Sequence, residues 1–143
     1  MSDKIFLDTN VIIYLYSEDE DEKRKIICEQ INSNYCITST QVLNEASNVW
    51  LKKYAFTIGQ VKTYLDGIEA VCDEILLIHR KTINQALNIK DRYGYSYYDS
   101  LVLASALESN CKTIITEDMS DGQIIFGSLE IANPFQRRFN KNT

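Results

Sequence analysis

The sequence predicts an α/β protein of three layers, α/β/α, in which helices cover both faces of a central, mainly parallel sheet. Short apolar, β-prone segments alternate along the chain with helix-length segments. A chain of 143 residues, 45% of them hydrophobic, is also long enough to bury one good core. Strands separated by helices are joined by right-handed crossovers, which produce a parallel sheet. We therefore expect a single domain over residues 1–143.

The first half of the chain is predicted to run strand, helix, helix, strand, helix. The apolar run from Ile5 to Leu7 indicates the first strand, and the segments between strands repeat apolar residues at helical spacing. The acidic run 18–22, followed by basic residues, is typical of a solvated helix start, because acids favour the positive end of the helix dipole. The predicted elements are Lys4–Leu7, Asn10–Tyr16, Asp21–Asn32, Tyr35–Thr38 and Thr40–Tyr54, with Trp50 facing inward.

The second half is predicted to run helix, strand, helix, helix, strand, strand. Its elements are Thr57–Val71, Glu74–Ile78, Lys81–Tyr93, Tyr97–Ser109, Lys112–Thr116 and Leu129–Ala132. Several tyrosines cluster between residues 93 and 98, and packing at the core or its rim is favoured over stacking on nucleic-acid bases. No segment reaches the roughly 20 apolar residues that span a bilayer, and no signal peptide precedes the first strand. We therefore expect a cytoplasmic protein that does not contact a membrane.

Four carboxylates occupy positions where this fold would bring them together. Asp8 and Asp118 follow strands, and in parallel sheets ligands bind beyond the carboxyl ends of the strands. Glu45 and Asp99 share the apolar faces of helices, where an unpaired charge costs several kcal/mol. Capping or turn formation is an alternative explanation for Asp8, Asp99 and Asp118 taken singly, but not for Glu45. Gathered carboxylates repel one another, and Mg²⁺ or Mn²⁺ would relieve that repulsion because hard cations prefer oxygen ligands.

The order and spacing of these acids resemble the four acidic motifs of PIN domains, over nearly the whole chain. The matching segments are Leu7-Asp8-Thr9-Asn10-Val11, Glu45 after Val42-Leu43-Asn44, Tyr98-Asp99-Ser100-Leu101 and Thr116-Glu117-Asp118-Met119. The tail resembles the bacterial branch that includes VapC-type toxins, through Gly122-Gln123, Gly127-Ser128-Leu129-Glu130-Ile131 and Asn133-Pro134-Phe135.

This resemblance implies a PIN-like, Mg²⁺- or Mn²⁺-dependent endoribonuclease, the toxin of a type II toxin–antitoxin pair. Such a protein is expected to form a homodimer, to cleave RNA and to be inhibited by a small antitoxin protein. The resemblance assigns Asp8, Glu45, Asp99 and Asp118 as catalytic and metal-binding acids, with Asp121 as a further metal ligand. It also assigns the positioning of substrate or water to Thr9, Asn10, Thr116 and Glu117. Which of Glu117, Asp118 and Asp121 faces the metal stays open, as does the number of metal ions.

A metal site of this kind predicts hydrolysis by water, with products that carry a 5′-phosphate and a 3′-hydroxyl. The net charge of −5 is unusual for an enzyme that acts on nucleic acid, since phosphate affinity comes mainly from basic side chains. The basic residues expected to line a groove beside the acids are Lys52, Lys53, Lys90, Arg92, Arg137, Arg138 and Lys141.

Three alternatives to a toxin nuclease remain open at this stage. A PIN-domain nuclease that processes RNA without being a toxin has the same motifs, and so does a non-catalytic PIN-like module that binds RNA or protein. A phosphatase with an aspartate nucleophile would require a second Asp where Asn10 stands. A zinc site is disfavoured because the four cysteines lack zinc-ligand spacing and His79 is the single imidazole, so we expect reduced, mostly buried cysteines.

Overall fold

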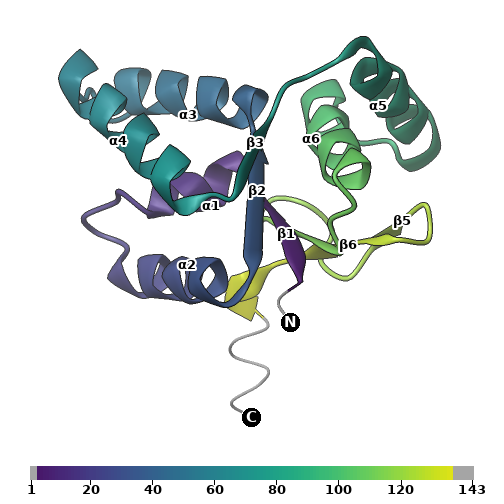
Figure 1. Cartoon of the computed structure of the whole chain (residues 1–143), viewed down its shortest axis with the longest axis horizontal. Coiled ribbons are helices and arrows are strands. Elements are labelled where there is room, and N and C mark those ends of the chain that lie inside the picture. The colour runs from purple at the N-terminus through teal and green to yellow at the C-terminus, as the bar shows by residue number, and fades with distance from the viewer. Residues whose placement is uncertain (1–2, 137–143) are drawn as a thin grey trace.

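The computed structural model of the chain describes residues 3–136. Within that range, a six-stranded sheet runs through the centre of the molecule in the order β3-β2-β1-β4-β6-β5 (Figure 1). The strands are β1 (Lys4–Leu7), β2 (Tyr35–Ser39), β3 (Glu74–Leu76), β4 (Thr113–Ile115), β5 (Ile124–Ile125) and β6 (Leu129–Ala132). All neighbours from β3 to β6 pair in parallel, and β5 pairs with β6 antiparallel. The predicted α/β class with a mainly parallel sheet is confirmed.

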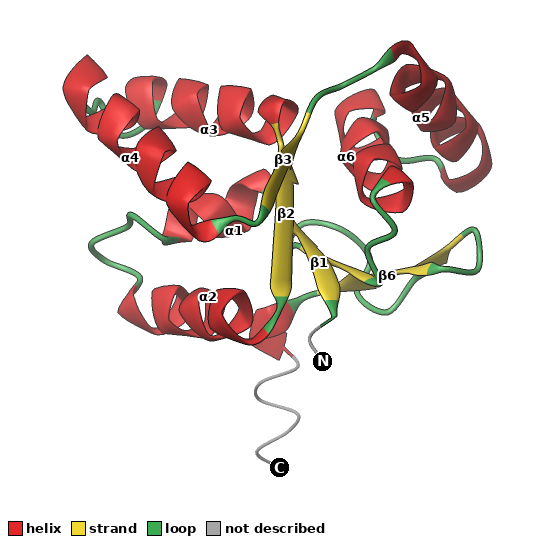
Figure 2. Ribbon diagram, in the orientation of Figure 1, coloured by secondary structure: helices red, strands yellow, loops and turns green. Residues whose placement is uncertain are grey.

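Helices cover both faces of this sheet, which gives the expected three layers (Figure 2). On one face lie α1 (Thr9–Tyr14), α2 (Asp21–Ser33), α3 (Thr40–Lys52) and α4 (Ile58–Val71). On the other face lie α5 (Arg80–Tyr93) and α6 (Tyr97–Glu108). Residues Ser100 to Ala106 of α6 are all buried, so the packing of this part of the helix fixes where its more exposed first turn lies.

The core consists of strand residues packed against one side of each helix. Phe6, Leu7, Ile37 and Ile114 are fully enclosed in the sheet. Trp50 faces inward from α3, as predicted, and only 1% of its surface is exposed.

The structure differs from the sequence prediction at helix ends and at the edge of the sheet. Helix α1 begins at Thr9 because the side chain of Asp8 caps it, and it ends at Tyr14 instead of Tyr16. Strand β5 was not predicted, since two residues are too few to show an alternating pattern. Phe126 and Gly127 make the following turn with positive φ angles of 47° and 73°, which lets the chain return beside β5.

The four cysteines are free, and three of them, Cys36, Cys72 and Cys111, are buried. Burial raises the pKa of Cys36 and of Cys72 to about 12, so these thiols stay protonated and unreactive. None of the helices in residues 3–136 combines the length and the apolar character needed to cross a bilayer.

Candidate active site

All four predicted carboxylates line one cleft of about 340 Å³ at the carboxyl edge of the sheet. Asp8 follows β1, Glu45 lies in the middle of α3, and Asp99 lies in the first turn of α6. Asp118 lies in the loop after β4. Four separate elements therefore contribute one acid each to the same cleft.

Asp8 is the most deeply buried of these acids, with 5% of its surface exposed. One of its oxygens, Oδ1, accepts a hydrogen bond from the backbone N–H of Thr9 at 2.7 Å, and Oδ2 accepts one from the Thr116 hydroxyl at 2.9 Å. Burial raises the pKa of Asp8 to about 6, and the nearby charges of Asp99 and Glu45 add to the increase while both hydrogen bonds oppose it. A charged Asp8 is therefore costly unless a cation compensates it.

Glu45 is held from two sides by neighbouring polar groups. Its Oε2 accepts a hydrogen bond from the Thr9 hydroxyl at 2.8 Å, and its Oε1 accepts one from the Gln41 amide at 3.0 Å. The same Gln41 amide donates to the backbone carbonyl of Tyr98 at 3.1 Å, which ties α3 to the first turn of α6. The carboxylate of Glu45 is therefore oriented by α1 and by its own helix.

Asp99 has the capping contact that the sequence suggested, and it lines the cleft as well. Its backbone N–H donates to the Ser96 hydroxyl at 3.2 Å, so Ser96 caps α6. Burial raises the pKa of Asp99, and the charges of Asp118 and Glu45 raise it further, although the Ser96 hydrogen bond opposes them. A capping contact at Asp99 and a place for its carboxylate in the acidic site are therefore compatible.

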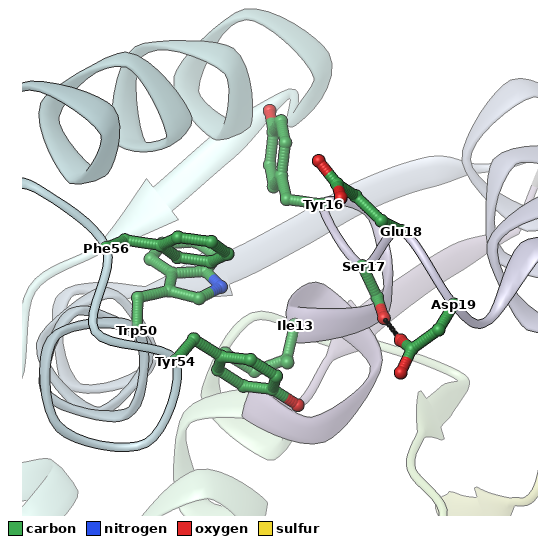
Figure 3. A pocket seen from close by; sticks show the side chains of 8 residues that line it. All are labelled: Ile13, Tyr16, Ser17, Glu18, Asp19, Trp50, Tyr54 and Phe56. Carbon is green, nitrogen blue, oxygen red and sulfur yellow. Dashed lines mark hydrogen bonds between the residues drawn. The ribbon is translucent and has the colours of Figure 1, made fainter.

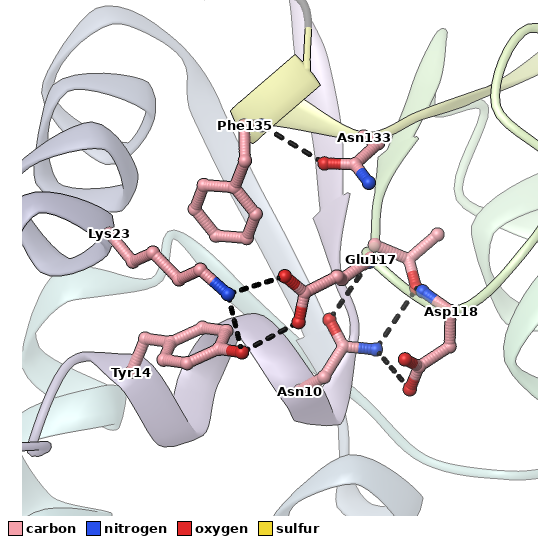
Figure 4. A network of polar contacts seen from close by, with 8 residues as sticks. Asn10, Tyr14, Lys23, Glu117, Asp118, Asn133 and Phe135 are labelled. Atoms are coloured by element: carbon pink, nitrogen blue, oxygen red, sulfur yellow. Dashed lines mark hydrogen bonds and ion pairs between the residues drawn. The ribbon is translucent and has the colours of Figure 1, made fainter. Parts of the chain in front are cut away.

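Asn10 holds the loop after β4 in place through both ends of its side-chain amide (Figure 4). Its Nδ2 donates to Asp118 Oδ2 at 2.9 Å and to the Thr116 hydroxyl at 3.1 Å, and it lies 3.5 Å from Asp8 Oδ2. Its Oδ1 accepts a hydrogen bond from the backbone N–H of Glu117 at 3.1 Å. One amide thus links the first and fourth acids of the cleft.

Glu117 borders the cleft, but its carboxylate is occupied by other partners (Figure 4). It forms an ion pair with Lys23 at 2.7 Å and accepts a hydrogen bond from the Tyr14 hydroxyl at 2.6 Å. The Lys23 ammonium also lies 4.6 Å from the Tyr14 ring centroid and 5.0 Å from that of Phe135. Burial alone would raise the pKa of Glu117, but the hydrogen bonds from Lys23 and Tyr14 outweigh it, so the pKa is lowered.

Asp121 does not line the cleft, and its Oδ1 accepts a hydrogen bond from the backbone N–H of Asn133 at 2.8 Å. Of the three acids left open by the sequence, Asp118 is therefore the one that lines the cleft and forms no ion pair with any of residues 3–136.

The predicted basic groove is only partly formed by the residues that the structure describes. Lys53 lines the cleft. Lys90 donates instead to the backbone carbonyl of Tyr95, and the Arg92 guanidinium lies over the rings of Tyr93 and Phe126. Arg137, Arg138 and Lys141 lie outside the described residues.

The donor groups of the cleft suit a hard divalent cation. They are carboxylate and hydroxyl oxygens, the ligands that Mg²⁺ and Mn²⁺ prefer. Burial and repulsion by neighbouring acids raise the pKa of Asp8, and a bound cation would compensate both effects by stabilising the charged carboxylate. In residues 3–136, however, no three acidic, His or Cys side chains are arranged closely enough to form a ready-made metal site. The chemistry of the residues thus fits a cation, although the carboxylates do not form a closed set of ligands.

Sequence reasoning missed Lys23, Tyr14 and Gln41. Lys23 belongs to a charged run that is typical of a solvated helix, yet its ammonium contacts Glu117, 94 positions away. No local pattern links such distant positions. For Gln41 the sequence does offer an indication of its contact with Glu45, because the two residues are four positions apart, about one helical turn.

A comparison with known families is consistent with this geometry. The sequence model of the PIN domain matches residues 5–120. No curated protein sequence matches the chain.

Three solved structures have a similar fold. A protein in a toxin–antitoxin complex from Klebsiella pneumoniae is 20% identical, with a TM-score of 0.68 over 91% of this chain and 97% of that one. The Mycobacterium tuberculosis toxin VapC20, which cleaves the sarcin–ricin loop, is 16% identical, with a TM-score of 0.64 over 80% of this chain and 89% of the toxin chain. A chain of VapBC2 from Rickettsia felis, bound to a promoter DNA fragment, is 18% identical, with a TM-score of 0.67 over 91% of this chain and 99% of that one. At these identities, the similarity shows a shared fold.

Proposed function

The chain belongs to the PIN domain family, and from this premise we propose that it is a metal-dependent endoribonuclease of the VapC type. The observation that carries the proposal is the single cleft lined by Asp8, Glu45, Asp99 and Asp118. The proposed substrate is RNA, and the reaction is hydrolysis of a phosphodiester bond. One of the structures with the same fold is of a toxin that cleaves the sarcin–ricin loop, which supports a cleavage reaction for the present chain.

The proposed ligands for Mg²⁺ or Mn²⁺ are Asp8 and Asp99, with Glu45 and Asp118 completing the site. When bound, such a cation activates water and offsets charge on the phosphorus oxygens. The products are then expected to carry a 5′-phosphate and a 3′-hydroxyl. Asp121 is a weaker candidate as a ligand, because its carboxylate contacts Asn133 outside the cleft.

The polar residues around the acids are proposed to position them for this reaction. Thr9 and Thr116 donate hydrogen bonds to Glu45 and Asp8, which fixes the orientation of both carboxylates. Asn10 fixes the Asp118 carboxylate in the same way. Glu117 is proposed to anchor the loop through Lys23 and not to bind metal. A site whose acids are already oriented loses little conformational freedom when substrate binds.

We also propose that a small antitoxin protein inhibits this nuclease. One of the structures with this fold is of a toxin–antitoxin complex, and an acidic cleft is a suitable binding site for Arg or Lys of a partner. The homodimer stays a prediction of the sequence resemblance, and the cytoplasmic location stays a prediction from the lengths of the apolar segments.

The test is cleavage of a mixed RNA pool by the purified protein, in Mn²⁺ and in EDTA, with the new 5′ ends mapped. We expect cuts that need the metal and that disappear in Asp8→Asn. The matched control is Asp66→Asn, because Asp66 is an exposed aspartate of α4 outside the cleft. This control should cut like the wild type.

The other readings of the sequence predict different outcomes. A binding module without activity would shift RNA in a gel but leave it intact in every lane. A phosphatase would release phosphate from a phosphomonoester substrate added in parallel. A nuclease with no toxin role would cleave RNA without slowing growth when the chain is expressed in a bacterial host.

A further inference from the structure

A second pocket of about 280 Å³ lies beside the carboxylate cleft, on the face formed by α1, α3 and the loop 15–20 (Figure 3). Its walls are mostly aromatic and include Tyr16, Trp50, Tyr54 and Phe56. The pocket is smaller than a typical site for a drug-sized ligand, so it suits a single planar group.

The aromatic walls are preformed. The Tyr16 ring stacks on Tyr64 with centroids 4.3 Å apart, and it meets Trp50 edge-on at 5.8 Å. Tyr54 and Phe56 are nearly parallel, with an interplanar angle of 12°. Tyr54 is also 38% exposed, so part of its ring remains available to a ligand. The pocket thus offers stacking surfaces that need no rearrangement.

Trp50 is only 1% exposed, and its indole N–H donates no hydrogen bond to any described residue; it is not one of the buried polar atoms left without a partner, so the nitrogen itself is open to the pocket. In Figure 3 its nitrogen faces the interior of the pocket. An indole N–H that opens into a pocket can donate to water when the pocket is empty, and an acceptor on a ligand can replace that water. A ligand that stacks here and brings an acceptor would satisfy this group.

The opposite rim of the pocket carries hydrogen-bond acceptors. Glu18 and Asp19 line it, and the Ser17 hydroxyl donates to Asp19 Oδ1 at 2.8 Å. Carboxylates repel a phosphate, but they accept hydrogen bonds from the amino and imino groups of a base. The pocket therefore combines flat walls, one donor and several acceptors, which is complementary to the polar edge of a nucleobase.

The pocket adjoins the proposed catalytic cleft, because Ile13 and Tyr54 line both. Lys53 lines the cleft, and its ammonium lies 5.7 Å from the centroid of the Tyr54 ring. A base in the pocket would therefore place its own phosphate near Lys53 and the next part of the strand near the acids. Aromatic pockets of this kind are typical of proteins that bind unstacked, single-stranded RNA.

We propose that this pocket binds one nucleobase of the RNA substrate, with the base stacked on the aromatic walls and an acceptor on its edge bonded to the Trp50 N–H. The inference rests on the proposed ribonuclease function and specifies how that function selects its cleavage site. A lysine or arginine side chain is a poorer occupant, because it offers no acceptor to the indole N–H.

Trp50 is the single tryptophan of the chain, so its fluorescence reports on this pocket directly. We would titrate the protein with each of the four ribonucleoside 5′-monophosphates in EDTA, with ribose 5-phosphate as the control ligand. Saturable quenching by at least one nucleotide, and none by ribose 5-phosphate, is the expected result. Because the titration is made in EDTA, it needs neither metal nor catalysis.

Two matched variants separate stacking from general effects. Tyr54→Leu removes an exposed wall of the pocket, and we expect about five- to a hundred-fold weaker nucleotide binding. Tyr35→Leu is the control, since Tyr35 begins β2 and does not line the pocket. It matches Tyr54 in its environment, because the Lys4 ammonium lies 5.7 Å from the centroid of the Tyr35 ring. Its nucleotide binding should be unchanged.

Trp50→Phe keeps an aromatic side chain and removes the N–H donor, and its smaller ring also leaves a cavity at this buried position, so folding of the variant is checked by its melting temperature. With mapped RNA cuts, we expect this variant to lose base preference at one fixed position near the cut while cleavage stays metal-dependent. No quenching by any nucleotide, or quenching only by a protein partner, would overturn the proposal even if the RNA is cleaved. Quenching without RNA cleavage would instead keep the base pocket and overturn the nuclease.

Discussion

The carboxylate of Asp8 has a structural role in capping α1 and a proposed role in binding metal. It caps α1 by accepting a hydrogen bond from the Thr9 N–H, and it lies in the proposed metal site with 5% of its surface exposed. Capping favours the charged form of Asp8, whereas burial and the neighbouring acids favour the protonated form. The balance places its pKa at about 6, above the ordinary 3.8.

This raised pKa predicts a pH dependence of metal binding. The proton on Asp8 stabilises the metal-free fold fully below pH 3.8, and that contribution is lost as the pH rises through about 6. A cation needs the deprotonated carboxylate, so added Mn²⁺ should raise the melting temperature little at pH 5 and much more at pH 7.5. Differential scanning fluorimetry with Mn²⁺ or EDTA at both values measures this. An equal increase at both pH values would contradict the assignment of Asp8 as a ligand.

Asn10 is predicted to act by positioning, because its amide links Asp118 and Thr116 and accepts from Glu117. Asn10→Ala should weaken Mn²⁺ binding by about 10- to 100-fold, as is usual when a group that orients metal ligands is lost. Isothermal titration calorimetry with Mn²⁺ gives the affinity. Asn48→Ala, at an exposed position of α3, is the control and should bind like the wild type.

The roles of the adjacent acids Glu117 and Asp118 can be separated in the same way. Glu117→Gln weakens a partly exposed ion pair with Lys23, so we expect a loss of about 1 kcal/mol in the free energy of unfolding and little change in Mn²⁺ affinity. Asp118→Asn should have the opposite pattern, with a large loss of Mn²⁺ affinity and little change in stability. If Glu117→Gln lost the metal instead, Glu117 would be the ligand.

At the scale of elements, the packing of α4 against the segment after α1 depends on one glycine. A Cβ atom at Gly67 would lie 2.0 Å from the hydroxyl oxygen of Tyr16 and 3.2 Å from its Cζ. Tyr16 cannot move freely, because it stacks on Tyr64 and contacts Trp50. Only glycine therefore lets α4 approach this closely.

Gly67→Ala should consequently destabilise the protein by about 1–3 kcal/mol, the usual cost of overpacking. In a helix without this contact, the same change would stabilise by up to about 1 kcal/mol. Gly59→Ala, in the same helix, tests that expectation, since its nearest atom would be 3.9 Å away. Urea unfolding of both variants measures the difference. Equal stability of the two would show that Tyr16 relaxes at no cost.

At the scale of the whole molecule, the parallel sheet collects side chains from distant segments at one edge. Asp8 and Asp118 follow neighbouring strands β1 and β4, and α3 and α6 add Glu45 and Asp99 from opposite faces of the sheet. The resulting cleft is acidic in a chain whose net charge is −5.

This charge predicts that RNA binding depends on the cation. In EDTA, repulsion between the acids and the phosphates should keep affinity weak, with a small salt dependence because few basic residues contact phosphate. Ca²⁺ should reduce this repulsion by neutralising the acids, so we expect it to tighten the binding of a labelled single-stranded RNA. Fluorescence anisotropy at 50 and 200 mM salt measures both effects. Tight binding in EDTA that falls steeply with salt would point to a basic surface instead.

Much of the fold could be predicted from the sequence, because strands and helices are encoded locally. The alternation of apolar and polar residues and the capping residues identified all elements except β5, within a few residues at their ends. The same local patterns indicated that Asp8 and Asp118 end strands and that Glu45 lies on an inward helix face. The sequence thus determined the α/β class and the four acids that line the cleft.

The tertiary structure decided which groups meet, since contacts between distant positions follow from packing and loop geometry and not from any local period. It turned Asp118 toward the cleft and Asp121 away from it, and it paired Glu117 with Lys23. It also assembled the aromatic pocket from α1, α3 and two loops, and left the Trp50 N–H facing into it. These contacts depend on the approach of whole elements, which a sequence read residue by residue does not contain.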